Sequence, residues 1–137
     1  MTGSDHGPGG LAPTTVVRTD RAPRPAGPYS QAVRAGDLLF VSGQVPREPD
    51  GSYVPRDVHA ETVRTLENLA AVAAAAGASL DRCVKVTAYL ADGADFAEFN
   101  RAYAEFFPEA PPARTTVVAG LREVKVEMDA ILHLGTR

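Results

Sequence analysis

The chain has 137 residues, of which 45% are hydrophobic and 23% are charged, and this length and composition are typical of one soluble globular domain. The same proportions exclude a wholly disordered chain, a collagen-like repeat and a coiled coil. Lysine and arginine number 14 against 17 for aspartate and glutamate, so the formal net charge is −3, which argues against the broad basic surface of a nucleic-acid-binding protein.

The chain begins with a tail and a first short strand. Residues 1–13 are rich in glycine, proline and small polar residues, which predicts a disordered N-terminal tail ahead of a domain that spans residues 14–137. Within that domain the segment 14–18 is short and β-branched, and we expect it to be an edge strand. Three prolines and a glycine between residues 22 and 28 predict a loop.

A β-hairpin is predicted next, with strands at residues 32–34 and 38–45 on either side of a turn at 35–37. The second strand is apolar on both faces at its start, so we expect it to lie centrally in a sheet.

The hydrophobic period then changes to that of a helix. Asp57 is a suitable N-cap and Gly77 a suitable stop, and between them apolar residues recur at helical spacing. We expect Glu61, Arg64 and Glu67 on the polar face of this helix.

The rest of the chain alternates between strands and one more helix. Residues 83–90 have the alternation of a half-buried strand, residues 92–107 return to helical spacing, and residues 114–119 and 124–134 predict two further strands. The predicted order β-β-β-α-β-α-β-β indicates an α+β domain whose two helices pack on one face of a sheet.

Two polar features stand out against this pattern. Ser42 and Gly43 interrupt an apolar strand, and a glycine there indicates either a β-bulge or a close approach of another group to the backbone. Arg114 opens a strand directly after prolines, and its guanidinium is either a solvated cation at a strand end or a fork positioned for a carboxylate.

A third feature is the alternation of charged and apolar residues over positions 125–129. A solvated strand face explains it, but a glutamate in a partly desolvated cleft would suit general acid–base chemistry. The chain has no P-loop, no G-x-G-x-x-G and no H-E-x-x-H. Its three histidines have no ligand spacing, so the sequence does not indicate a metal site.

Cys83 is the only cysteine, so it forms no internal disulfide, and its strand-like context favours a buried free thiol. The longest apolar run is too short to span a bilayer, and the first residues lack the pattern of a signal peptide. We therefore expect a cytoplasmic protein with no membrane partner.

Several segments, in register along the chain, resemble the Rid (reactive intermediate deaminase, or YjgF) family. The resemblance covers roughly residues 15–134, and no single motif carries it. The segments are GPYSQAV at 27–33, LFVSGQVP at 39–46, TLENL at 65–69, AG at 76–77, VKVT at 84–87, FAEFNRAYAEFF at 96–107, PARTTV at 112–117 and VEMDAI at 126–131.

The resemblance implies a chorismate-mutase-like fold with a mixed β-sheet, assembled as a homotrimer whose sheets form an inner barrel and whose clefts lie between subunits. It implies hydrolytic deamination of 2-imino or 2-enamino acids, of the 2-iminobutanoate and 2-iminopropanoate type, to 2-keto acids and ammonia. It also implies that no cofactor or metal takes part.

The resemblance also implies roles for individual residues. Arg114 would bind the substrate carboxylate, Glu127 would position the attacking water and move its proton, and Tyr29 would hydrogen-bond substrate or water. Ser42 and Gly43 would line the pocket through their backbone. Asn100 would support the site from the second predicted helix.

The chain departs from the family pattern at two places. Thr115 and Thr116 stand where many members have serine and cysteine, and the turn over residues 121–125 is one residue shorter than usual and lacks a proline. We expect the shorter turn to reshape the cleft. These departures keep one alternative open, a non-hydrolytic or pathway-specific relative that binds a small carboxylate metabolite. A further alternative is the endoribonuclease activity assigned to some members of the family, which the acidic charge balance disfavours.

Overall fold

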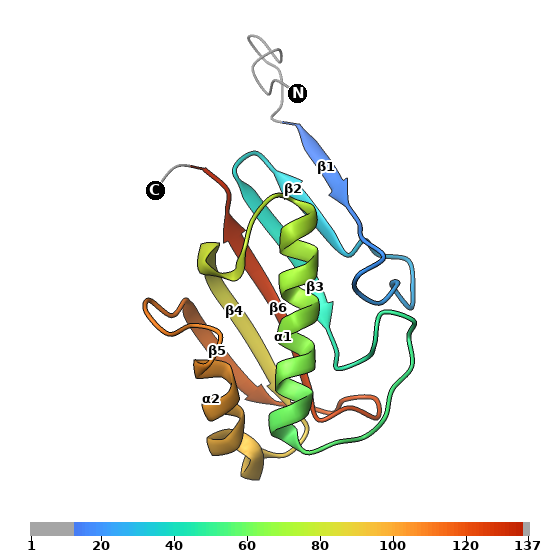
Figure 1. Ribbon diagram of the computed structural model, residues 1–137, viewed down its shortest axis with the longest axis vertical. Coiled ribbons are helices and arrows are strands. Elements are labelled where there is room, and N and C mark those ends of the chain that lie inside the picture. The colour runs from blue at the N-terminus through green and yellow to red at the C-terminus, as the bar shows by residue number, and fades with distance from the viewer. Residues whose placement is uncertain (1–12, 136–137) are drawn as a thin grey trace.

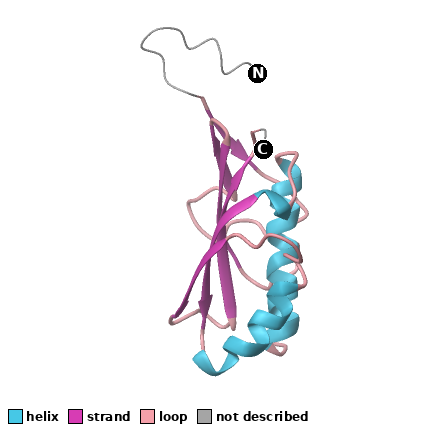
Figure 2. Ribbon diagram, turned by 90° about the vertical axis from the view of Figure 1, so that its left-hand side faces the viewer, coloured by secondary structure: helices cyan, strands magenta, loops and turns pink. Residues whose placement is uncertain are grey.

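The computed structural model describes residues 13–135 and has one sheet with two helices on one of its faces (Figures 1 and 2). The strand order is β1-β2-β3-β6-β4-β5. The predicted α+β class is confirmed, whereas the predicted tail lies outside the described residues except for Pro13. The elements are β1 (Thr14–Val17), β2 (Ala32–Ala35), β3 (Leu38–Gln44), α1 (Val58–Ala75), η2 (Leu80–Arg82), β4 (Cys83–Leu90), η3 (Gly93–Asp95), α2 (Phe96–Ala104), β5 (Ala113–Val118) and β6 (Val126–His133).

The first three strands form an antiparallel meander in which β1 is the edge strand and β3 lies inside the sheet, as predicted. On β3 the side chains of Leu39 and Val41 face the helices and are buried, whereas Phe40 on the other face is 43% exposed. The helices therefore cover only one side of a strand that is apolar on both. We call the uncovered side the open face of the sheet.

The second half of the sheet contains β6, β4 and β5, which pair both antiparallel and parallel. The last strand, β6, lies between β3 and β4 and is antiparallel to both. Strand β5 is parallel to β4, and α2 makes the crossover that two parallel neighbours require. This arrangement leaves β5 at the edge of the sheet opposite β1 (Figure 1).

Helix α1 begins and ends as predicted, because the Asp57 carboxylate accepts a hydrogen bond from the Ala60 N–H (2.8 Å) and Gly77 has a φ of 79°. Its polar face differs from the expectation at Glu61, which is 1% exposed. Glu61 lies within the first turn, where its carboxylate accepts hydrogen bonds from the loop before α1 and from the turn before β6, so its burial is compensated.

Two further expectations were wrong in detail. The alternation of β4 fails at its start, where Cys83 is buried and Val84 is exposed, because the register with β6 shifts between Cys83 and Lys85. Helix α2 begins at Phe96 rather than Asp92, because Asp92 caps the 3-10 turn η3 instead, and it ends at Ala104 rather than at residue 107.

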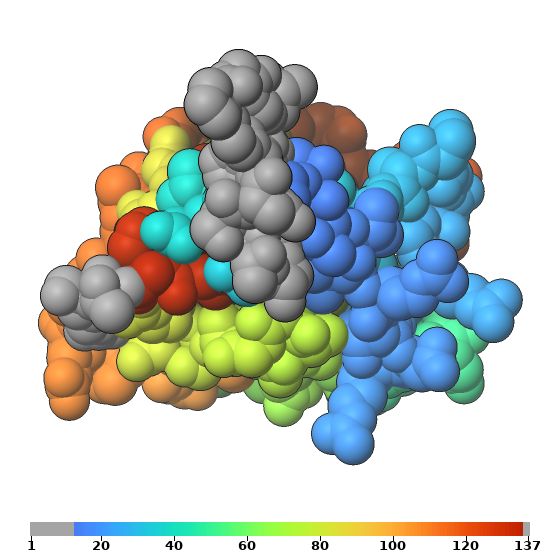
Figure 3. Space-filling model, turned by 90° about the horizontal axis from the view of Figure 1, so that it is seen from above, coloured from blue at the N-terminus to red at the C-terminus, as the bar shows by residue number. Residues whose placement is uncertain are grey.

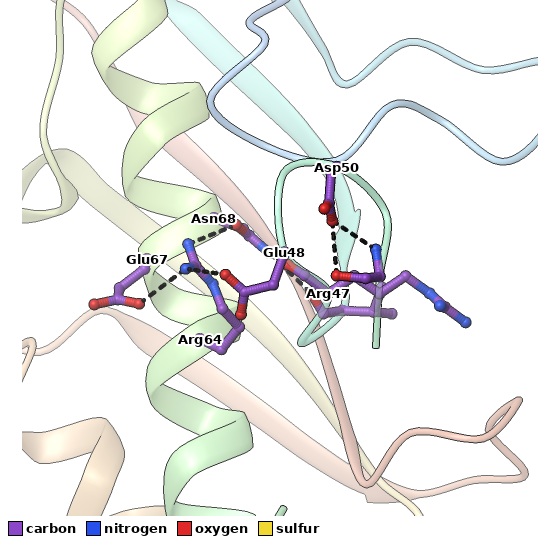
Figure 4. A network of polar contacts seen from close by, with 8 residues as sticks. Arg47, Glu48, Asp50, Arg64, Glu67 and Asn68 are labelled. Carbon is purple, nitrogen blue, oxygen red and sulfur yellow. Dashed lines mark hydrogen bonds and ion pairs between the residues drawn. The ribbon is translucent and has the colours of Figure 1, made fainter. Parts of the chain in front are cut away.

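The loop between β3 and α1 is held against α1 by a polar network (Figure 4). The buried Asn68 amide donates hydrogen bonds to the carbonyls of Val45 (2.9 Å) and Arg47 (2.8 Å). Arg64 donates to the Asn68 carbonyl oxygen (2.9 Å) and forms an ion pair with Glu48 (3.4 Å). The chain that leaves β3 is therefore fixed in position directly after Gln44.

Candidate functional site

A hollow of about 620 Å³ lies on the open face of the sheet, over β3 and β6. Four of the predicted site residues line it, namely Tyr29, Ser42, Gly43 and Glu127. The remaining two, Arg114 and Asn100, do not line it. The structure therefore divides the predicted site residues into two groups.

Gly43 and Glu127 are in close contact across the strands that form the floor of the hollow. The register between β3 and β6 shifts between Val41 and Gln44, so the predicted β-bulge is present. The predicted close approach is present too, because a Cβ atom on residue 43 would lie 2.2 Å from Oε2 of Glu127. Any side chain at this position would displace the carboxyl group.

The pKa of the Glu127 carboxyl is raised, first by burial and second by the negative charge of Asp129, two residues along the same face. Asp129 in turn accepts a hydrogen bond from the Tyr89 hydroxyl (3.0 Å), and Tyr89 is the register partner of Glu127 on β4. A carboxyl group with a raised pKa exchanges protons closer to neutral pH, as general acid–base catalysis requires. The interpretation of residues 125–129 as a fully solvated strand face is therefore wrong at Glu127.

Tyr29 and Ser42 are positioned by the chain that precedes β2. The Ser42 hydroxyl donates to the carbonyl of Ser30 (2.6 Å), and the Ser42 N–H donates to the carbonyl of Gln31 (2.9 Å). The Tyr29 hydroxyl accepts a hydrogen bond from the Ala26 N–H (3.1 Å), and its ring remains half exposed. The Tyr29 ring thus forms a fixed wall of the hollow that still faces solvent.

Gln31 is a structural residue of the site that the sequence analysis did not single out. Its side chain is buried and accepts a hydrogen bond from the Thr19 N–H (2.7 Å). Its amide donates to the carbonyls of Thr19 (3.0 Å) and Pro23 (2.9 Å), so one side chain organises the proline-rich loop that carries Tyr29. The position of Gln31, between a proline-rich loop and an apolar strand, could have predicted this role. Such a loop leaves backbone N–H and C=O groups without partners, and a side-chain amide can bind both kinds.

Arg114 and Asn100 meet on the other face of the sheet, beneath α2. The Arg114 guanidinium donates a hydrogen bond to the Asn100 side-chain oxygen (2.8 Å). It also lies over the rings of Tyr103, Phe99 and Phe96, at 4.7, 5.2 and 5.9 Å from the ring centres. The alternative of a freely solvated strand-end cation is therefore wrong, because the guanidinium is held by an amide and stacked on aromatic rings.

The separation of Arg114 from Glu127 follows from strand register. Arg114 pairs with Val86, whose side chain faces the helices, whereas Glu127 pairs with Tyr89 on the open face. Within one chain the two residues that the resemblance assigns to catalysis therefore lie on opposite faces of the sheet. Arg114 is on β5, which is an edge strand of the sheet that the described residues form.

The shortened turn before β6 is fastened to α1. Both oxygens of the buried Glu61 carboxylate are used: one accepts from the Lys125 N–H (2.9 Å), and the other accepts from the Tyr53 hydroxyl (2.8 Å) and the Arg56 N–H (3.0 Å). Glu123 in this turn has a φ of 70° and forms an ion pair with Arg47. None of residues 121–125 lines the hollow, whose part on β6 starts at Glu127, so an effect of the turn on the cleft stays a prediction.

Residues 13–135 hold few other groups that could react or bind a metal. No three histidine, cysteine, aspartate or glutamate side chains in this part of the chain are grouped as they would be to hold a metal ion. Burial raises the pKa of the Cys83 thiol to about 12, so it is not a thiolate at neutral pH. Neither described helix is long and apolar enough to cross a membrane.

The chain is similar in sequence and in structure to proteins of one family. The model of the Endoribonuclease L-PSP family matches residues 19–134. A RutC family protein of Pyrococcus abyssi is 47% identical over 121 residues, which are 86% of this chain and 95% of that protein. Reactive Intermediate Deaminase A, chloroplastic, of Arabidopsis thaliana is 41% identical over 122 residues, covering 87% and 65% of the two chains. The crystal structure of E. coli TdcF with bound serine is similar with a TM-score of 0.82 and 36% identity, covering 87% of this chain and 98% of that one.

Proposed function

The chain belongs to the Rid family, which the Endoribonuclease L-PSP model describes, and from this premise we propose that it hydrolyses reactive 2-imino acids. The reaction takes R–C(=NH)–COO⁻ and water to the 2-keto acid R–CO–COO⁻ and ammonia. A 2-enamino acid enters the same reaction after tautomerisation to the imine. The observation that carries the proposal is a carboxyl group of raised pKa, Glu127, pressed against Gly43 in an open hollow.

In the proposed reaction Glu127 acts first as a base and then as an acid. It takes a proton from water while the water oxygen forms a bond to the imine carbon, and it gives this proton to the imine nitrogen, which yields a neutral tetrahedral carbinolamine. In the second step Glu127 takes the proton of the carbinolamine hydroxyl and moves it to the amine nitrogen, so that the C=O bond forms as the C–N bond breaks and ammonia leaves. Each step transfers a proton over a short distance, for which a carboxyl with a pKa closer to neutral is suited.

Arg114 is the proposed binding group for the substrate carboxylate. A guanidinium held by Asn100 and stacked on Tyr103 presents its fork in one orientation, and bidentate pairing with a carboxylate then fixes the position of the imine carbon. Because Arg114 and Glu127 lie on opposite faces of one sheet, we propose that each site combines the Glu127 of one subunit with the Arg114 of its neighbour.

A homotrimer satisfies this requirement and also accounts for the open face. Leu38 and Phe40 on β3 and Val117 on β5 are exposed in one chain, and association of three open faces into an inner barrel would bury them. The edge strand β5 would then bring Arg114 to the hollow of the next subunit. The relative E. coli TdcF, whose structure contains serine, supports a small amino-acid-derived ligand in this fold.

The proposed hydrolysis needs only water, a carboxyl group and a guanidinium, and we expect it to proceed without a cofactor, in the cytoplasm. The test is a coupled assay in which an amino-acid oxidase generates 2-iminopropanoate or 2-iminobutanoate in the presence of the protein. We expect keto-acid release faster than the spontaneous rate, and loss of this acceleration in Arg114→Ala and Glu127→Gln. The control Arg101→Ala removes an exposed arginine of α2 and should be as active as the wild type. Full activity of Arg114→Ala would disprove the proposal.

A further inference from the structure

A second hollow, of about 530 Å³, shares the Tyr29 ring with the first one. Its walls come from β1 and from the proline-rich loop that follows, whose residues, blue in Figure 3, project from one edge of the molecule. Because Tyr29 lines both hollows, they adjoin at this residue, and a ligand that reached from Glu127 past Tyr29 would enter the second hollow.

The walls of the second hollow are held in place by internal contacts. The hydrogen bonds of Gln31 to Thr19 and Pro23 close the loop on itself. Pro23 and Pro25 restrict the backbone between these anchors. The Arg21 N–H donates to the Thr19 hydroxyl (3.1 Å), which holds the middle of the loop. The hollow is therefore preformed, so little ordering is needed when a ligand binds.

The charge of the second hollow is opposite to that of the whole chain. Arg18 and Arg24 line it, and the described residues offer neither of them a hydrogen bond or an ion pair. Asp20 is the single acidic side chain in the described lining, so two arginines face one aspartate, whereas the chain as a whole carries a net charge of −3. The first hollow, in contrast, is lined by Glu127 and Asp129, and none of its lining residues within 13–135 is basic.

We propose, on the basis of the function proposed above, that the second hollow binds the distal carboxylate of a dicarboxylic 2-imino acid. The imine carbon would lie beside Glu127, with the first carboxylate on the neighbouring subunit's arginine, and the side chain would pass Tyr29 toward Arg18 and Arg24. An arginine fork recognises a carboxylate at such an exposed position, and the acidic first hollow repels it. The preferred substrates are therefore imines of amino acids with an acidic side chain.

The test compares the imine of glutamate with that of norvaline, a neutral amino acid with the same number of carbons, each generated in the assay by an amino-acid oxidase. In the double variant Arg18→Ala/Arg24→Ala we expect kcat/KM for the glutamate imine to fall at least about fivefold, the value of one favourable exposed ion pair. The norvaline imine should be unaffected within about twofold. Higher ionic strength should reduce the difference.

Arg21→Ala is the matched control, because Arg21 is exposed on the same loop but is not among the residues lining the hollow. A second measurement needs no turnover: calorimetric titration with the two products, 2-oxoglutarate and 2-oxopentanoate. We expect tighter binding of 2-oxoglutarate to the wild type and loss of that preference in the double variant. Equal behaviour of the wild type and the double variant toward both ligands overturns the proposal. Absence of turnover for either imine overturns the proposed function instead, and the titration still decides the binding site.

Discussion

Replacing Gly43 with alanine tests whether the position of the Glu127 carboxyl matters for the reaction. The added Cβ would lie 2.2 Å from Oε2, 3.1 Å from Cδ and 3.4 Å from Cγ of Glu127. Ordinary contact begins near 3.4 Å, so Oε2 must move by about 1.2 Å. Because Oε2 is the far end of a flexible side chain, the fold can accommodate this movement, and we expect the free energy of unfolding to fall by only about 1 kcal/mol.

The effect on the reaction should be much larger than the effect on stability. A misplacement of about 1 Å in a catalytic group costs about 100-fold in rate, which corresponds to about 2.7 kcal/mol of transition-state free energy. We therefore expect kcat for a 2-imino acid to fall about 100-fold in Gly43→Ala while the thermal midpoint changes little. The measurements are the oxidase-coupled assay and a thermal melt of the same preparation.

The control is Gly120→Ala, because a Cβ at Gly120 would have no atom within 4 Å and the residue has no positive φ. This variant should retain wild-type activity. Wild-type kcat in Gly43→Ala would refute the reasoning, because it would show that the position of the carboxyl is irrelevant.

Three further predictions follow from the site and its supports. Asp129→Asn removes a negative charge that helps to raise the pKa of Glu127, so this pKa should fall. Activity rises on the acid limb of the pH–rate profile as Glu127 loses its proton, and we expect this limb to move to lower pH. A limb that does not move would show that it does not report the titration of Glu127. Glu61→Ala removes the acceptor of hydrogen bonds from Tyr53, Arg56 and Lys125. Thermal melts should therefore show that the free energy of unfolding falls by about 3 kcal/mol, and by less in Glu61→Gln. Cys83 should react with a thiol reagent only as fast as the protein unfolds, because its thiol is buried and its pKa is about 12; labelling in the native state at the rate of free cysteine would contradict this.

The secondary structure could be predicted largely from sequence because its signals are local. The cap at Asp57, the stop at Gly77 and the alternation in β6 each depend on a few neighbouring residues. The start of α2 is not fixed by the sequence, because Asp92 is a suitable cap for either a helix or a 3-10 turn; in the structure it accepts a hydrogen bond from the Ala94 N–H (2.9 Å) and caps η3, and α2 begins at Phe96.

The site was less predictable because its contacts join distant parts of the chain. Gly43 was identified as unusual, but its contact with Glu127 depends on β3 pairing with the last strand. The buried roles of Glu61 and Gln31 depend on backbone groups 64 and 12 residues away. No spacing rule places Arg114 and Glu127 on opposite faces, since that follows from the parallel pairing of β5 with β4.

The placement of Arg114 and Glu127 on opposite faces has a genetic consequence if sites form between subunits. A chain that carries Arg114→Ala still supplies an intact Glu127, and a chain that carries Glu127→Gln still supplies an intact Arg114. When the two inactive proteins are unfolded together and reassembled at equal amounts, about one site in four of a cyclic trimer combines both intact residues. Two inactive alleles would therefore complement each other in one cell, and the mixture would regain about a quarter of the wild-type rate.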